Sequence, residues 1–381
     1  MINIKDPSDC CGCTACASIC NHDAITMEPD ALGFLYPKVD ESKCTDCGLC
    51  EKVCAFNDNY DKSLNLPKPD AYAARHKDLS QLRYSRSGAV FVALSDRIIS
   101  RGGVVYGAGY NGFEKIIHKR AVTKEERDEF KGSKYVQSDL RGVFRQVKTD
   151  LQNGRTVLFS GTPCQTAALH SFIGKRYRAN LFLVDIICHS VPSPAIWSDY
   201  VKYIENKFKS KIVKLEFRDK SIGWYQTHLE SFTFANGSNH KDYLLRILFN
   251  AGLGTRPSCQ KCKYANLKRP SDITIGDFWG YEKVAAEMNL DNKGISLVLC
   301  NTDKGTELFE SVQEELHTKL VPLESALQPN LQTPSSVDER YDQFAEDYKD
   351  KGFIYIGKKY ANIGYKYKLN QFLEKIKRHL L

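Results

Sequence analysis

The feature that most constrains this chain is a cysteine pattern that occurs twice near its N-terminus. The first run has the spacing CxxCxxCxxxC and consists of Cys10, Cys13, Cys16 and Cys20. The same spacing recurs 34 residues later, at Cys44, Cys47, Cys50 and Cys54. This part of the chain is therefore an internal duplication, and each half supplies four thiols from one short segment.

Two runs of this kind indicate 4Fe-4S clusters, because a cubane cluster needs four thiolates and a CxxCxxC loop can supply three of them. In bacterial two-cluster ferredoxins the fourth ligand comes from the other run. We therefore predict one cluster at Cys10, Cys13, Cys16 and Cys54 and another at Cys44, Cys47, Cys50 and Cys20. Cys11 is left over. Zinc is the alternative, but zinc sites normally use CxxC pairs that lie far apart in the sequence.

The proline that typically follows the fourth cysteine is missing from both runs. Asn21 stands there in the first run and Ala55 in the second. The turn loses a fixed φ, but no ligand is lost.

The compartment expected for this chain is the cytoplasm. The start, MINIKDPSDC, lacks the basic and apolar stretches of a signal peptide, and no window approaches a membrane span. In a reducing compartment the 14 cysteines are not expected to pair as disulfides. Metal or redox chemistry is then the leading explanation for them.

The chain divides by pattern into a small module, a linker and a larger body. AITMEP and FLYPKVD alternate like two strands of a hairpin, which fits a dicluster ferredoxin-type domain over 1–60. Polar residues and prolines predict a linker over 61–72, and a C-terminal basic helical tail is expected over 336–381. Between them, 73–150 and 151–335 are expected to form the two parts of the body.

Within the body, strands and helices alternate. We expect a helix over 89–100, strands over 104–110, 156–160 and 180–188, and a loop at GTPCQ before the next helix. Ser193 and Pro194 predict the start of a further helix, and two antiparallel strands follow over 211–219 and 228–237. The fold class is α+β or mixed α/β, with a ferredoxin-like domain followed by a larger mixed-sheet body.

Four further cysteines occupy informative positions in the body, namely Cys164, Cys188, Cys259 and Cys262. Read singly, each has an ordinary explanation: a small core residue, a zinc half-site or a dithiol. Together they are enough for a third 4Fe-4S cluster, and spacing alone leaves both readings open. Cys300 ends a strand-like stretch and is expected in the core.

The body resembles the beta subunits of coenzyme F-420 hydrogenases and dehydrogenases and their ferredoxin-fused relatives. The segments that carry the resemblance are SRSG (85–88), GSKYVQS (132–138), SGTPCQ (160–165), DIICHSVPSP (185–194), FRDKSIGW (217–224) and RPSCQKCKYANLKRPSDITIGDFWG (256–280). The resemblance implies bound FAD and a third 4Fe-4S cluster in this body. Two departures are visible: Ala89 replaces a second glycine after SxSG, and Ser190 replaces the glycine of CHG.

The expected cofactor-binding residues are Ser85, Arg86, Ser87, Gly88, Lys134, Tyr135, Gln137, Ser138 and Thr162. No GxGxxG follows a strand, so a Rossmann-type site is unsupported. The FAD pyrophosphate could instead lie at the N-terminus of the helix that SRSG opens. Lys134 could offset phosphate charge or polarise the isoalloxazine, and Tyr135 could stack on it. The alternative for GSKYVQS alone is an ordinary exposed strand or turn.

The net charge of +8 comes largely from the end of the chain, where residues 358–381 contain seven Lys or Arg and one Glu. Leu369, Phe372, Leu373, Ile376 and Leu380 fall at helical spacing there. Such a basic amphipathic tail could contact an acidic partner or a membrane surface, and the alternative is a helix packed on its own domain. No motif supports nucleic-acid binding.

The sequence therefore predicts an iron-sulfur flavoprotein oxidoreductase. Electrons would pass between a donor such as ferredoxin, a reduced deazaflavin or a nicotinamide and a small organic substrate. Two alternatives remain: an electron-transfer subunit that serves a partner oxidoreductase, and a non-catalytic iron-sulfur sensor or scaffold.

Overall fold

The body of the chain is built on one eight-stranded mixed sheet. The computed structural model describes residues 1–221, 223–225 and 229–364. The strand order is β13-β3-β12-β11-β7-β6-β4-β5, in which the run β11-β7-β6-β4 is parallel and the outer pairs are antiparallel. The bounds are β3 (Asp70–His76), β4 (Val104–Tyr110), β5 (Ile116–Ala121), β6 (Val157–Gly161), β7 (Leu181–Ile186), β11 (Ile273–Asp277), β12 (Ser296–Cys300) and β13 (Leu316–Val321). The predicted mixed sheet is confirmed.

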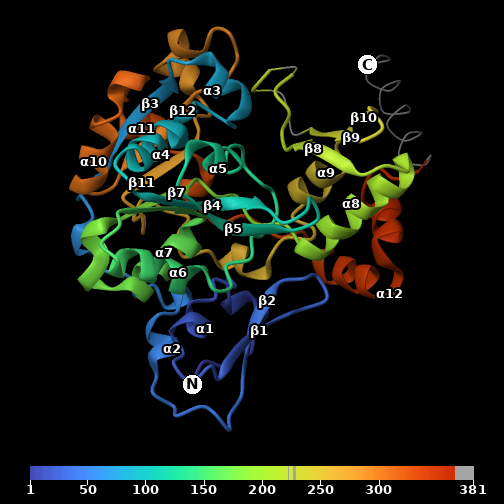
Figure 1. Ribbon diagram of the computed structural model, residues 1–381. Coiled ribbons are helices and arrows are strands. Elements are labelled where there is room, and N and C mark those ends of the chain that lie inside the picture. Colours follow the sequence, from blue (N-terminus) through green and yellow to red (C-terminus); the bar gives the residue numbers. More distant parts are fainter. Residues whose placement is uncertain (222, 226–228, 365–381) are drawn as a thin grey trace.

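Helices cover both faces of this sheet (Figure 1). One face is covered by α4 (Val90–Ser100) and α10 (Asp303–Glu310), and the other by α6 (Val143–Gln152) and α7 (Pro163–Ile173). The shorter helices are α3 (Leu79–Tyr84), α5 (Lys124–Asp128) and α11 (Leu323–Ala326). In α4 the buried residues Val90, Ala93, Leu94 and Ile98 recur at three- and four-residue spacing, which is why this predicted helix packs on the sheet.

The loop predicted at GTPCQ is partly wrong, because α7 already begins at Pro163. Proline is well suited to the first position of a helix, where its missing N–H would have no acceptor. Cys164 therefore lies in the first turn of α7 rather than in a loop.

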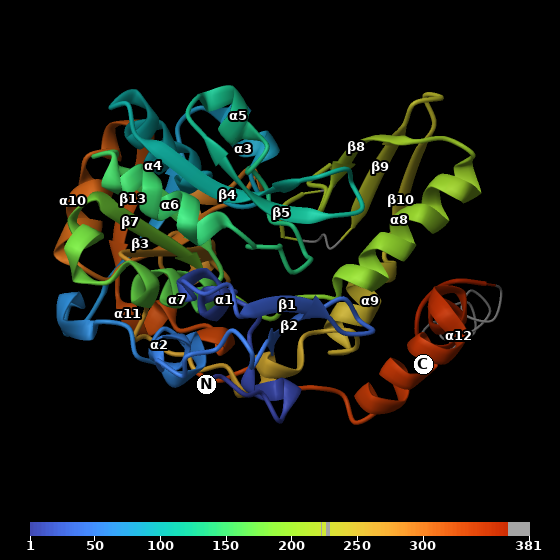
Figure 2. The same cartoon turned by 60° about the horizontal axis from the view of Figure 1, so that its bottom comes forward.

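A second group of helices and strands packs around an aromatic-rich core of its own (Figure 2). It contains the three-stranded sheet β8 (Ile212–Glu216), β9 (Glu230–Phe234) and β10 (Asn239–Asp242), with α8 (Pro194–Phe208), α9 (Leu244–Asn250) and α12 (Tyr341–Tyr360). The Ser193 hydroxyl accepts from the Ile196 N–H at 3.1 Å, so the predicted N-cap of α8 is present. The predicted antiparallel pair is β8 with β9.

The N-terminal module lies against the face of the body that carries α6 and α7 (Figure 1). It consists of α1 (Ala15–Ile19), the antiparallel hairpin β1 (Ile25–Pro29) and β2 (Leu35–Val39), and α2 (Leu49–Lys52). The segment after it is fixed along the body: the Asn65 side chain donates to the Arg269 carbonyl at 2.7 Å, and the Leu66 N–H donates to the Asn301 carbonyl at 2.8 Å. The stretch that we predicted as a linker thus packs against the body.

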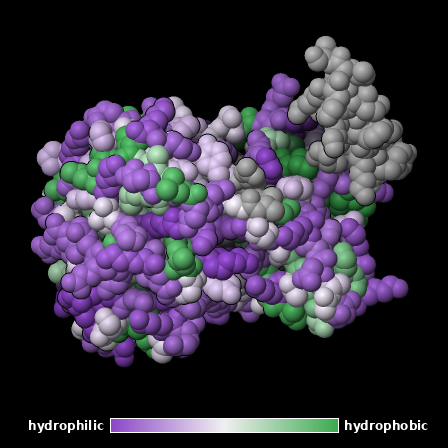
Figure 3. All heavy atoms as spheres, turned by 90° about the horizontal axis from the view of Figure 1, so that it is seen from above, coloured by the Kyte–Doolittle hydropathy of each residue, from purple (hydrophilic) through white to green (hydrophobic). Residues whose placement is uncertain are grey.

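No helix among the described residues is long and apolar enough to cross a membrane. On the face seen in Figure 3, hydrophilic side chains predominate and hydrophobic ones form small separate groups. The apolar residues predicted for the basic C-terminal tail, from Leu369 onwards, lie outside the described residues.

Candidate functional site

The first thiol group combines three cysteines of the first run with one of the second. Burial raises the pKa of Cys16 well above its ordinary value, and the nearby thiols of Cys13, Cys10 and Cys54 raise it further. Burial also raises the pKa of Cys54 to about 11, again with contributions from Cys13 and Cys10. Cys54 is thus grouped with the first run, as crossed ligation requires.

The second thiol group is the complement of the first. Cys20, Cys44, Cys47 and Cys50 line one small cavity of the module. The N–H of Ile2 donates to the Cys50 sulfur at 3.3 Å. Such N–H groups stabilise thiolate charge, so this cavity suits a negatively charged cluster.

The duplication extends to the backbone of the two loops. The N–H of Gly12 donates to the Cys10 sulfur at 3.4 Å, and the N–H of Asp46, 34 residues later, donates to the Cys44 sulfur at 3.4 Å. Both residues are left-handed, with φ of 65° and 47°. Thr14 and Gly48 form a second equivalent pair, with φ of 64° and 72°. Both halves therefore wrap their thiols with the same sequence of turns.

A third thiol group forms in the body from Cys164, Cys188, Cys259 and Cys262. Cys164 lies at the start of α7, directly after β6, and Cys188 follows β7. The strands β6 and β7 are parallel neighbours, so they end at the same edge of the sheet. Burial raises the pKa of Cys188 well above its ordinary value, and the thiols of Cys259, Cys164 and Cys262 raise it further. The four cysteines that the sequence offered for a third cluster are therefore neighbours.

The thiols of the described residues do not converge on a position for a single metal ion. Among the described residues, no three or more His, Cys, Asp or Glu side chains are arranged to hold a single metal ion. In a 4Fe-4S cluster each thiolate binds a different iron, so its four ligands need not converge on one atom.

Cys11 lies between the first and third thiol groups. Hydrogen bonding with the thiols of Cys13 and Cys164, followed by burial, raises the pKa of Cys11 well above its ordinary value. The same contact with Cys11 lowers the pKa of Cys164 to about 7. The prediction left Cys11 without a role. The one available signal was the doublet Cys10-Cys11, which the second run replaces with Cys44-Thr45.

Arg256 joins the module to the body, and sequence reasoning missed it. Its side chain is fully buried and donates to the Cys10 carbonyl at 2.7 Å, the Leu35 carbonyl at 2.9 Å and the Gln137 side-chain oxygen at 2.9 Å. A Cβ on Gly12 would lie 2.6 Å from an Arg256 nitrogen, and Gly12 has a φ of 65°, so glycine fits here without displacing Arg256. The guanidinium counteracts the burial that raises the pKa of Cys10.

Gln137 belongs to the same junction rather than to a cofactor pocket. Its side-chain N–H donates to the Cys11 carbonyl at 2.8 Å while its oxygen accepts from Arg256. A large cavity in the body is lined by the neighbours Val136 and Ser138 but not by Gln137 itself. We had expected Gln137 to bind the cofactor, and the structure places it between module and body instead.

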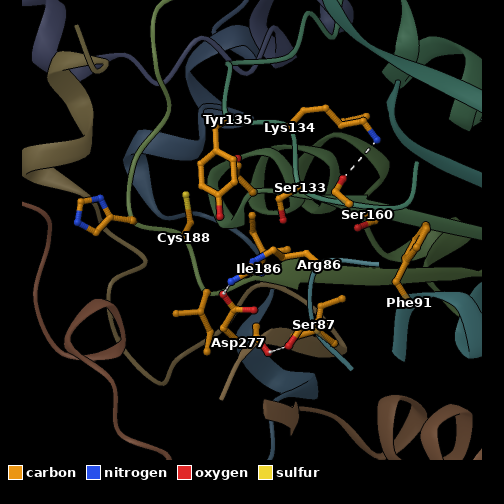
Figure 4. A pocket seen from close by; sticks show the side chains of 18 of the residues that line it. Arg86, Ser87, Phe91, Ser133, Lys134, Tyr135, Ser160, Ile186, Cys188 and Asp277 are labelled. Carbon is orange, nitrogen blue, oxygen red and sulfur yellow. Dashed lines mark hydrogen bonds and ion pairs between the residues drawn. The ribbon is translucent and has the colours of Figure 1, made fainter. Parts of the chain in front are cut away.

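That cavity has a volume of about 470 Å³ and lies beside the third thiol group (Figure 4). Cys188 lines it directly, as do the aromatic side chains of Tyr135, Phe249 and Trp279. A cavity of this size and mixed character suits an organic cofactor. The predicted cofactor residues that line it are Ser85, Arg86, Ser87, Lys134, Tyr135, Ser138 and Thr162.

Gly88 does not line the cavity, although it was predicted with these residues. A Cβ at this position would lie 2.2 Å from the Ala74 carbonyl oxygen, so the glycine allows the chain to pass close to β3. Its N–H donates to the Ser296 hydroxyl at 2.9 Å. The amide that we expected at a phosphate is therefore already bound.

Some polar groups of the cavity already have hydrogen-bond partners within the chain, and others do not. The Ser87 hydroxyl donates to the Ile295 carbonyl at 2.6 Å. The Lys134 amine donates to the carbonyls of Lys131 at 3.0 Å and Gly132 at 3.3 Å, and burial lowers its pKa to about 7. In contrast, the buried Ser85 hydroxyl has no partner among the described residues. A buried hydroxyl rarely stays unsatisfied, so Ser85 fits a bound polar group.

His118 is a further cavity residue that the sequence did not reveal. Burial lowers its pKa to about 4, so the ring is neutral at pH 7. Its Nε2–H donates to the Ser160 carbonyl at 2.9 Å, which leaves Nδ1 to accept from the Ser138 hydroxyl at 2.9 Å. The histidine thus fixes the orientation of the Ser138 side chain.

Comparisons with known proteins agree with both halves of the chain. Residues 9–57 match the family model of the 4Fe-4S dicluster domain. Residues 154–326 match the model of the C terminus of the coenzyme F420 hydrogenase/dehydrogenase beta subunits. The B subunit of the Na(+)-translocating ferredoxin:NAD(+) oxidoreductase complex of Acetobacterium woodii is 44% identical over 45 residues, 12% of each chain. The match thus spans about one eighth of that curated relative.

Among solved structures, the F420-reducing [NiFe] hydrogenase complex from Methanosarcina barkeri, a xenon derivative, contains a similar chain. The alignment covers 77% of this chain and 93% of that one, with 18% identity and a TM-score of 0.48. The two family matches confirm the predicted fusion. Residues 9–57 form a 4Fe-4S dicluster domain, and residues 154–326 form a domain of the kind found at the C terminus of the coenzyme F420 hydrogenase/dehydrogenase beta subunits.

Proposed function

We propose that this chain is an iron-sulfur flavoprotein oxidoreductase that passes electrons through three 4Fe-4S clusters to FAD and on to an organic substrate or a deazaflavin-type coenzyme. The observation that carries the proposal is the position of Cys188. Its thiol is grouped with Cys164, Cys259 and Cys262, and the same side chain lines the large cavity. A cluster held there would lie directly beside the cofactor.

The contacts of Cys11 connect the first thiol group with the third. The first group is linked through Cys11 to Cys164, which belongs to the third group at the cavity. FAD supplies the conversion between single electrons and electron pairs that a hydride acceptor needs. The proposal keeps the predicted division into a module over 1–60, a connection over 61–72, a body in two parts, 73–150 and 151–335, and a tail over 336–381.

Within the cavity, the chain's own residues would bind and orient the cofactor. Ser85 offers an unsatisfied hydroxyl, and Tyr135 offers an aromatic face. Thr162 opens α7, where its N–H is bound by the Gln165 side-chain oxygen at 2.9 Å and its hydroxyl lies 3.2 Å from the Cys164 sulfur. The start of this helix thus connects a cofactor residue with a cluster ligand.

Anaerobic purification followed by iron, sulfide and flavin analysis tests this composition. Three clusters correspond to about 12 irons per chain and two to about 8. We expect the higher figure with one FAD, and Cys259→Ala should remove about 4 irons without changing the spectra of the module clusters. Cys300→Ala is the matched control, since Cys300 is fully buried in the sheet. Iron near the lower figure in fully flavinated protein would contradict the third cluster.

A second candidate function is that of an electron-transfer subunit that serves a partner oxidoreductase. The 45-residue match to one subunit of a ferredoxin:NAD(+) oxidoreductase complex favours this reading. Reoxidation of the reduced flavin in the isolated chain distinguishes these two candidate functions. Reoxidation by a small organic acceptor supports the enzyme, whereas reoxidation only after a partner protein is added supports the electron-transfer role.

A further inference from the structure

A second cavity, of about 260 Å³, adjoins the cofactor cavity. It lies between the segment that follows α3 and the strand β8, at the junction of the two sheets. The residues that line both cavities are Ser85, Arg86, Lys131, Gly132, Ser133 and Arg218. The two cavities therefore meet at a pair of arginines.

The second cavity is graded from an exposed mouth to a buried end. The side chains of Arg83 and Lys214 are 47% and 53% exposed. Those of Arg86 and Arg218 are 8% and 6% exposed. A ligand that enters from solvent would thus pass weakly held cations and reach the two buried arginines where the cavities meet.

The acidic residues that line this cavity are already paired with lysines, two of which, Lys131 and Lys214, line the same cavity. Asp128 pairs with Lys131 at 2.7 Å, Glu129 with Lys119 at 2.6 Å, and Glu216 with Lys214 at 2.7 Å. At the buried end, the carboxylate of Asp277 pairs with both arginines.

Positive charge exceeds negative charge at the buried end. One Asp277 oxygen lies 3.2 Å from Arg86 and 2.9 Å from Arg218, so a single carboxylate serves two guanidinium groups. Lys220 adds a third cation, whose amine donates to the carbonyls of Leu82 and Lys293 and to no carboxylate within the described residues. Burial and the nearby Arg86 lower the pKa of Lys220 to about 7, which reflects the crowding of cations.

Arg86 also has unused donors. Its Nη2 donates to the Trp224 carbonyl at 3.3 Å and faces Asp277, but its buried Nε and Nη1 have no partner among the described residues. Figure 4 shows the guanidinium between Tyr135 and Asp277, in the middle of the site. Leaving two desolvated donors unpaired is costly, and arginine pairs best with the oxygens of carboxylates and phosphates.

We propose that the second cavity binds the anionic end of an organic substrate, a carboxylate or a phosphate, with Arg86 as the principal contact and Lys220 beside it. The rest of the substrate would then extend past the two arginines into the cofactor cavity. This last step rests on the proposed function, whereas anion binding itself does not. The sequence-based expectation assigned Arg86 to the flavin pyrophosphate, so the test has to separate these two roles.

Calorimetric titration of the purified full-length protein with inorganic phosphate and, separately, with succinate tests the site. Chloride keeps the ionic strength constant, because non-specific charge effects are screened equally in both arms. We expect one anion to bind saturably with one site per chain and more tightly than the other, which identifies the phosphate or carboxylate class. Arg86→Gln should weaken this binding at least about tenfold, and Lys220→Met severalfold, since each removes a charged donor.

Arg83→Gln is the matched control, because Arg83 lines the same cavity but is exposed and paired with Glu216 at 3.3 Å. It should change the affinity by less than about twofold. Flavin content is measured in each variant by absorbance. The proposal is overturned if neither anion binds the wild type, if both inner variants bind like the wild type, or if Arg86→Gln loses flavin while Lys220→Met binds anions normally. Absence of flavin in the wild type with anion binding intact would contradict only the proposed function.

Discussion

Ala89 adopts a conformation that glycine takes more easily. It precedes α4 with a φ of 60°, in the left-handed region, at the position where the family resemblance led us to expect a second glycine. A side chain there costs roughly 1 kcal/mol. We predict that Ala89→Gly raises the melting temperature by roughly 1–2 °C, measured by thermal unfolding.

Ala93→Gly is the control for this change. Ala93 lies inside α4 and is 2% exposed, so glycine there loses packing and costs about 1 kcal/mol of helix propensity. It should lower the melting temperature. If both substitutions lower it, the relief of backbone strain at Ala89 is refuted.

At this scale, the sequence was informative wherever function depends on local spacing. The eight module cysteines were predicted from their intervals alone, and Cys300 was correctly expected in the core, where it is fully buried. The contact between Gln137 and Arg256 was not predicted, because the two residues are 119 positions apart in the sequence. Ser190, the other departure from the family, has no positive φ, so no glycine is required there.

At the scale of elements, the duplicated loops exchange one ligand each. Because Cys54 is grouped with Cys13, Cys54→Ala and Cys13→Ala should damage the same cluster. Cys20→Ala should damage the other one, together with Cys47→Ala. Electron paramagnetic resonance of the four reduced variants checks this. Loss of one common signal in Cys54→Ala and Cys47→Ala would show that each run ligates its own cluster.

Arg256 should influence the clusters on both sides of it. Its guanidinium is buried beside Cys10 and Cys259, so Arg256→Met removes a positive charge that stabilises the reduced, more negative state. The potentials of the first and third clusters should fall, and that of the cluster at Cys44 should change least. Redox titration followed by paramagnetic resonance measures all three.

Arg145→Met provides the comparison for that experiment. Arg145 also ties the module to the body, through the carbonyls of Ser18 at 2.9 Å and Cys20 at 2.7 Å, but its side chain is 49% exposed. Water screens its charge, so the potentials should shift less than in Arg256→Met. Equal shifts in the two variants would indicate loosened docking rather than a local charge effect.

For the elements themselves, periodicity predicted α4, α8 and the hairpin β1–β2 correctly. It could not show that β8 and β9 leave the main sheet to form a sheet of their own, since strand partners are set by tertiary packing. The start of α7 was also predicted wrongly from local sequence. Gly-Thr-Pro by itself indicates a turn, but in this fold the proline is the first residue of a helix.

At the scale of the whole molecule, docking of the module on the body brings the first thiol group next to the third. The module buries Cys11 and Cys13 against α6 and α7, in one core with the strands β6 and β7. The second thiol group reaches solvent, because Cys47 is the one exposed cysteine of the described chain. Under the proposed function, electrons would be exchanged with a protein partner at Cys47 and with a small molecule at the cavity.

This assignment can be tested through the cluster farthest from the cavity. In Cys47→Ser, a reduced ferredoxin should reduce the flavin much more slowly than in the wild type, because the entry cluster is impaired while the remaining route is intact. Dithionite, a small reductant that can reach the cavity itself, should reduce both proteins at similar rates. Cys300→Ser controls for a general effect of losing a thiol. Stopped-flow absorbance of the flavin gives the rates, and a Cys47→Ser protein as fast as the wild type with ferredoxin would mean that electrons enter elsewhere.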